Sequence, residues 1–162
     1  MTQKELEFTS QRCTTKEQSQ QLLEMGLKPE TADMVYHFTG SRIEAMQWEL
    51  QAKPPTLRGK FWTEERIAKL ARIGQSGEEV FDKLWGKDIP AWSLSRLLEL
   101  LPNKIKVAEH EFIFALMHEY DGSWCASYCG AKFFIKGTIF EACTSMIEWL
   151  IKNDYFNKDY LQ

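Results

Sequence analysis

Three short apolar segments in the last third of the chain are separated by turn-forming residues, and they constrain the fold more than any other feature. The segments span residues 110–119, 123–129 and 131–135, and residues 104–108 add a candidate edge strand. Asp121-Gly122 separates the first two segments, and an Asp-Gly pair between apolar runs is typical of a β-hairpin. Gly130 provides the next turn. We therefore expect an antiparallel sheet of three to four strands over 104–135.

Two helices are expected to pack on this sheet. The C-terminal helix starts near Thr138. An earlier helix spans 94–101, with Ser93 as its N-cap and Pro102 at its end. Helices followed by an antiparallel meander and a closing helix predict an α+β fold, with both helices on one face of the sheet. The C-terminal helix has a wide apolar stripe, formed by Ile139, Ala142, Met146, Ile147, Leu150 and Ile151.

The first forty residues predict one helix and one extended segment. Thr14 and Glu17 have the spacing of a capping box, in which a side chain at each position satisfies a free backbone N–H of the other. Gly26 is a favourable helix stop because glycine adopts the left-handed conformation at little cost. Residues 34–38 alternate in a way that favours a strand.

The middle of the chain, residues 40–88, is expected to be a helical segment that contains a loop. Residues 43–50 fit a short amphipathic helix, and the Pro- and Gly-containing stretch 53–59 predicts a loop. A helix capped by Thr63 follows, and a shorter one ends at Gly86. We expect this segment and the N-terminal helix to form a helical layer within a single domain, residues 1–162.

Composition places the chain among globular proteins. Of its 162 residues, 44% are hydrophobic and 27% are charged, which is the balance of a folded domain. The net charge is −3, which excludes both a polybasic coat for nucleic acid and a strongly acidic mimic. The N-terminal residues hold no apolar signal segment, and the apolar runs are too short to span a membrane. We expect a cytoplasmic protein with no membrane segment.

The sequence favours neither a metal-dependent nor a thiol-dependent catalytic site. Cys125 and Cys129 are four residues apart on a predicted strand, which does not suit a zinc knuckle, and no metal site is predicted. No glycine-rich phosphate loop is present, and no cofactor is predicted. His118, Asp121 and Cys125 are compatible with a thiol- or metal-dependent enzyme, which is the least favoured hypothesis.

A stretch rich in basic and aromatic residues gives a second hypothesis. Residues 53–72 carry six positive charges and two negative ones, with aromatic side chains among them. Basic groups beside exposed aromatics are typical of single-strand nucleic-acid binding. Helix 94–101, in contrast, has few side chains that could contact base edges. The predicted aromatic and basic surface consists of Arg58, Lys60, Trp62, Arg66, Lys69 and Trp92.

Three segments resemble small uncharacterised proteins of gut Bacteroides and related bacteria. The matching segments are residues 16–37, 76–102 and 141–157. The family is associated with phages and mobile elements and has no assigned activity, so no residue role transfers to this chain. The resemblance implies a bacterial, cytosolic accessory protein.

The leading hypothesis is a non-enzymatic accessory or interaction protein of a mobile element. The chain has six tryptophans and 13% aromatic residues, and exposed aromatics are typical of protein-binding surfaces. Trp48, Trp62 and Trp92 lie beside loops or prolines and are the predicted exposed ones. The expected partner is another protein, with a homodimer as one form of this interaction.

Overall fold

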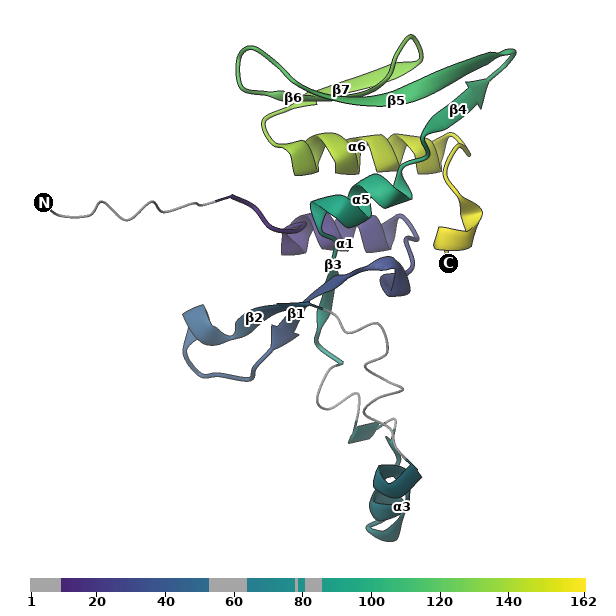
Figure 1. Cartoon of the computed structure of the whole chain (residues 1–162). Coiled ribbons are helices and arrows are strands. Elements are labelled where there is room, and N and C mark those ends of the chain that lie inside the picture. Colours follow the sequence, from purple (N-terminus) through teal and green to yellow (C-terminus); the bar gives the residue numbers. More distant parts are fainter. Residues whose placement is uncertain (1–9, 53–63, 78, 81–85) are drawn as a thin grey trace, which may run out of the picture.

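The computed structural model describes residues 10–52, 64–77, 79–80 and 86–162. These residues form an α+β fold, as the sequence predicts, with two antiparallel sheets of four and three strands. Figure 1 shows the larger sheet at one end of the molecule, with helices below it and the smaller sheet beyond them.

The larger sheet is a meander of four strands in sequence order, which confirms the sheet expected over 104–135. Each strand pairs antiparallel with the next. The hairpin between the second and third strands turns at Gly122, whose φ of 86° favours glycine. The strands are β4 (Lys104–Val107), β5 (His110–His118), β6 (Trp124–Tyr128) and β7 (Lys132–Lys136).

The closing helix α6 (Ile139–Lys152) lies along one face of this sheet, where it packs on β6 and β7 (Figure 1). Thr138 and Glu141 form a reciprocal capping box at its start. Its predicted apolar stripe is largely buried in the core. The shorter helix α5 (Leu94–Leu100), capped by Ser93, packs against α6.

Helix α1 (Lys16–Glu24) is present, but its cap lies one residue later than predicted. Thr15 and Gln18, not Thr14 and Glu17, form the capping box. The Thr14 hydroxyl has other partners, because it accepts a hydrogen bond from the Trp92 backbone N–H at 3.0 Å. Two adjacent threonines made both registers compatible with the sequence.

The smaller sheet was not predicted as a sheet. The expected strand over 34–38 is β1 (Met34–Phe38), and it is the central strand of this sheet. Its neighbours are β2 (Trp48–Ala52) and β3 (Ile89–Ala91). The amphipathic helix expected over 43–50 was therefore wrong in its second half. Short 3₁₀ helices occupy Pro29–Thr31, Glu44–Met46 and Lys158–Tyr160.

The 40–88 segment does not form the expected helical layer. It contributes β2 to the smaller sheet and contains α3 (Glu64–Arg72), which buries none of its residues. Figure 1 shows α3 apart from α1, α5 and α6. The loop expected over 53–59 and the body of the second short helix lie outside the described residues.

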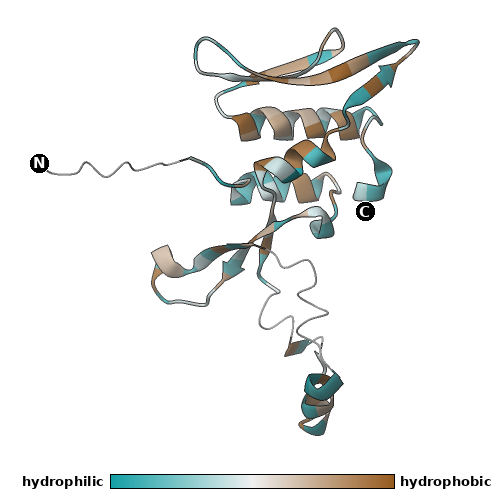
Figure 2. Cartoon of the chain, in the orientation of Figure 1, coloured by the Kyte–Doolittle hydropathy of each residue, from teal (hydrophilic) through white to brown (hydrophobic). Residues whose placement is uncertain are grey.

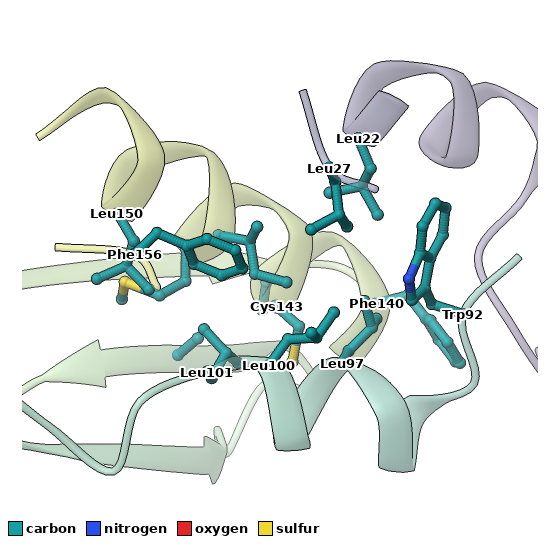
Figure 3. Packing of buried hydrophobic residues seen from close by; sticks show 14 of the residues in the cluster. Leu22, Leu27, Trp92, Leu97, Leu100, Leu101, Phe140, Cys143, Leu150 and Phe156 are labelled. Carbon is teal, nitrogen blue, oxygen red and sulfur yellow. The ribbon is translucent and has the colours of Figure 1, made fainter. Parts of the chain in front are cut away.

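The hydrophobic core lies between the meander and the smaller sheet. Apolar residues concentrate on α5, α6 and the meander (Figure 2). Figure 3 shows Leu97 and Phe140, from α5 and α6, beside Trp92. Residues of α1, α5, α6 and β6 belong to one cluster with Trp92. The inward side chains of the meander, such as Phe114 and Phe134, pack against this cluster.

Candidate functional site

Exposed apolar side chains gather on the face of the meander opposite α6. Strand alternation directs even-numbered residues of β5, β6 and β7 toward the core, so odd-numbered ones lie on the other face. Four of these odd-numbered side chains are large, apolar and exposed: Ile113 (70%), Phe133 (65%), Ile135 (52%) and Met117 (45%). We call this surface the outer face; its members are Ile113, Ala115, Met117, Cys125, Ser127, Phe133 and Ile135.

The strand register arranges the outer face in rows. Met117, Cys125 and Ile135 are aligned across β5, β6 and β7. Ala115, Ser127 and Phe133 form the next row. The small side chains of β6 thus lie between larger ones on both sides, and Cys125 and Ser127 are buried although no described element covers them. The result is a continuous, mainly apolar surface.

Charged residues lie at the two ends of the outer face. Across the β4–β5 pair, Lys104 lies opposite Ile113, and Lys106 lies opposite Glu111. The Lys104 ammonium lies 3.0 Å from a carboxylate oxygen of Glu111. At the other end of β5, Glu119 lies just beyond the strand, and its odd position places it on the same side as the outer face.

Cys125, at the centre of the outer face, is not set up as a nucleophile. Burial raises the pKa of its thiol, and the Glu119 carboxylate beside it raises the pKa further. Reactive cysteines need the opposite shift, because the thiolate is the attacking species. Cys129, at the end of β6, is exposed, and its sulfur lies 3.6 Å from the Ser127 hydroxyl.

The predicted thiol-enzyme residues do not converge. His118 pairs with Trp124 in the sheet, and the two rings are 4.7 Å apart, on the face opposite Cys125. Asp121 accepts hydrogen bonds from the backbone N–H and hydroxyl of Ser123 in the hairpin turn. The Ser123 hydrogen bonds also lower the pKa of the Asp121 carboxyl. Asp121 therefore acts as a turn residue.

The predicted basic and aromatic surface is only partly within the described residues. Arg58, Lys60 and Trp62 lie outside them. Arg66 and Lys69 are exposed on α3, where the Lys69 ammonium lies 2.8 Å from the Glu65 carboxylate.

The prediction that Trp92 belongs to this exposed surface was wrong, because its side chain is fully buried. Its indole N–H donates to the Thr31 hydroxyl at 2.9 Å, which satisfies the polar edge of the ring inside the core.

Trp48, another tryptophan predicted to be exposed, is half-buried in a small aromatic cluster on the smaller sheet. Its ring lies 5.2 Å from that of Phe38, edge to face. Lys16 lies over Trp48 and Lys87 over Phe38. These ammonium groups occupy ring faces that stacked bases would need. The cluster is best explained as structural.

The described part of the chain lacks two other kinds of functional feature. Its His, Cys, Asp and Glu residues form no group of three or more that could hold a metal ion. None of its helices combines the length and apolar character needed to cross a membrane.

No protein-family model, curated protein or solved structure matches the chain. The function must therefore be inferred from the residues themselves. Sequence analysis missed the outer face, although a signal was present: residues 112–117 of β5 and 133–135 of β7 are apolar without alternation. Such continuous runs are typical of strands covered on both faces.

Proposed function

We propose that this chain is a non-enzymatic protein-interaction protein whose binding surface is the outer face of the meander. One observation carries the proposal: Ile113, Met117, Phe133 and Ile135 are exposed together on one face of a sheet whose other face holds the core. Large exposed apolar patches on a folded domain are typical of binding sites.

Further features support the same function. The raised thiol pKa of Cys125 and the separation of His118 from it argue against thiol catalysis. The resemblance to small proteins of phages and mobile elements supports an accessory role in the cytoplasm of a bacterium. The partner is therefore sought among the proteins of that compartment.

Photo-crosslinking at the outer face tests this function. A photo-reactive benzoylphenylalanine replaces Phe133 in cells that naturally make the protein, and crosslinked products are identified by mass spectrometry. We expect crosslinks to a protein from this position. The same residue at position 43 is the matched control, because Ile43 is also exposed (59%) but lies far from the meander in sequence. Absence of crosslinks at 133, or equal crosslinking at 43, contradicts the proposal.

Nucleic-acid binding is the second candidate, and the exposure of α3 is the observation that favours it. Arg66, Lys69 and Arg72 are exposed on this helix. Binding through such residues should weaken steeply with salt, because counterions are released when phosphates are neutralised. A filter-binding titration with single- and double-stranded DNA at low and high salt tests it. An absence of binding at low salt contradicts this candidate.

A further inference from the structure

Strand β7 is an edge of the meander, and among the described strands it pairs with β6 alone. An edge strand presents a row of unpaired backbone N–H and C=O groups along its free side. An extended segment of another protein can pair with such a row and add one strand to the sheet. This edge also borders the outer face, because Phe133 and Ile135 belong to both.

The charges of β7 favour one class of partner. Lys132 and Lys136 lie four residues apart, so their side chains are on the same side of the sheet as α6 and about 13 Å apart along the strand. Lys136 is exposed, and the Lys132 ammonium lies 4.9 Å from the centre of the Phe134 ring. Neither ammonium forms an ion pair within the described part of the chain. Both positive charges are therefore complementary to carboxylates with the same spacing on an added strand.

A second copy of β7 fits this edge poorly. In a symmetric antiparallel pairing centred on Phe134, Lys132 of one copy would lie opposite Lys136 of the other. Like charges directly opposite each other destabilise a strand pair, and lysines on edge strands commonly prevent such pairing. The same lysines that disfavour pairing between copies attract a strand that carries acidic residues at these positions.

The opposite edge of the meander, β4, has its lysine charges offset within the sheet. The Lys104 ammonium lies 3.0 Å from a carboxylate oxygen of Glu111. Lys106 lies directly opposite Glu111 in the β4–β5 pair. The two edges therefore carry the same number of lysines, but the positive charge of β7 alone is left without a carboxylate. This makes β4 a reference for experiments on β7.

We propose that the edge of β7 binds an extended acidic segment of a partner protein by strand addition; this inference rests on the proposed function. The residues of the added strand opposite Lys132 and Lys136 carry carboxylates. Those opposite Phe133 and Ile135 lie on the side of the outer face and are apolar, because they continue its two rows. The bound segment therefore alternates over five residues: acidic, apolar, any residue, apolar, acidic.

A nuclear magnetic resonance titration of isotope-labelled protein with a short peptide tests strand addition. The probe is Ser-Glu-Val-Thr-Val-Glu-Ser with blocked ends, and Ser-Val-Glu-Thr-Glu-Val-Ser is the control of identical composition and charge. We expect the probe to shift the amide signals of β7 and to bind at least about fivefold more tightly than the control, whose carboxylates cannot reach both lysines. Equal binding of the two peptides, or no shifts in β7 up to about 1 mM probe, overturns the proposal.

Matched variants at the two edges separate strand addition from attraction by net charge. Replacement of both β7 lysines, Lys132→Gln with Lys136→Gln, should weaken probe binding by roughly fivefold to tenfold. Lys104→Gln with Lys106→Gln removes the same charge from β4 and should leave binding unchanged. Circular dichroism confirms that each variant is folded. Equal losses for the two edges overturn the proposed site.

The peptide backbone provides a test that contact through side chains alone would not pass. The amides of alternate residues point to the same side of a strand, so one alternate set faces β7 and the other faces solvent. N-methylation of one set should abolish binding of the probe, and N-methylation of the other set should leave it largely unchanged. Similar effects of the two modifications contradict strand addition.

Photo-crosslinking from position 133 separates this inference from the proposed function. Crosslinks that map to a partner segment with the acidic and apolar alternation support both. Crosslinks to a partner protein, together with no binding of the acidic probe, overturn strand addition and leave the proposed function intact. An absence of both crosslinks and probe binding overturns both proposals.

Discussion

At the scale of single residues, Trp92 joins three parts of the chain that are distant in sequence. Its backbone N–H donates to the Thr14 hydroxyl, its carbonyl accepts from the Thr14 N–H at 2.9 Å, and its indole donates to Thr31. The ring itself is fully buried in the core. Trp92 therefore links the N-terminal segment to the start of α5 through both hydrogen bonds and packing.

Truncation of this side chain should be strongly destabilising. We expect Trp92→Ala to lower the free energy of unfolding by about 3–5 kcal/mol, because it removes a large buried side chain and leaves a cavity. Trp92→Phe should cost less, since it keeps most of the packing and loses the hydrogen bond to Thr31. Urea denaturation followed by circular dichroism measures both. A loss for Trp92→Ala no larger than that for the half-buried Trp48→Ala would contradict this role.

The burial of Trp92 could not be predicted from its neighbours in sequence. Pro90 and a predicted helix cap flank it, and such surroundings favour an exposed position. The hydroxyl that accepts its indole N–H belongs to Thr31, which is 61 residues earlier in the chain. Local sequence does not show that these two residues lie close together. The position of the α1 cap could not be predicted for the same reason. The Thr14 hydroxyl accepts a hydrogen bond from Trp92, a residue distant in sequence, and Thr15 caps the helix instead.

The four cysteines should differ sharply in reactivity. Burial raises the thiol pKa of Cys13, Cys125 and Cys143, and that of Cys143 reaches about 12. A raised pKa keeps the thiol protonated, so at pH 8 only about 1 in 10,000 Cys143 thiols is ionised. We expect iodoacetamide to modify Cys129, the exposed cysteine, first. The rates at the other three should increase as the pH rises.

Mass spectrometry of peptides from briefly alkylated protein measures these rates separately. Labelling of unfolded protein in urea is the control, because all four thiols should then react at similar rates. Modification of Cys143 as fast as that of Cys129 in the folded protein would contradict the burial of Cys143.

At the scale of elements, α6 depends on its first turn. The Thr138 hydroxyl accepts from the Glu141 N–H at 3.2 Å, and the Glu141 carboxylate accepts from the Thr138 N–H at 3.1 Å. These bonds satisfy backbone donors that the helix itself cannot pair. The helix carries six buried residues, so its loss exposes much of the core.

Removal of this cap should destabilise the whole chain. We expect Thr138→Ala to lower the free energy of unfolding by about 1 kcal/mol. Glu141→Gln should lower it less, because glutamine can also complete a capping box. Urea denaturation measures both variants. No loss for Thr138→Ala would show that the cap contributes little. A loss for Glu141→Gln as large as that for Thr138→Ala would show that glutamine does not complete the capping box here.

The elements that sequence predicted well have strong local signals. The Asp-Gly hairpin, the Ser93 and Thr138 caps and the apolar stripe of α6 are each visible within a few residues. The strand β2 gives a weaker signal, an apolar–polar alternation over only five residues in a stretch that also fits an amphipathic helix. Its sequence, Trp48–Ala52, mixes polar and apolar residues on a half-exposed edge. Only its pairing with β1 makes it a strand, and that pairing joins residues separated by a loop.

At the scale of the whole molecule, the meander has one covered face and one exposed face. The sequence of β5 is apolar on both, so sequence alone could not say which face holds the core. The predicted binding surface was placed on basic and aromatic residues of the middle segment, whereas the outer face consists mainly of aliphatic ones. Exposed aromatic residues are typical of binding surfaces, but Trp92, one of the six tryptophans, lies in the core.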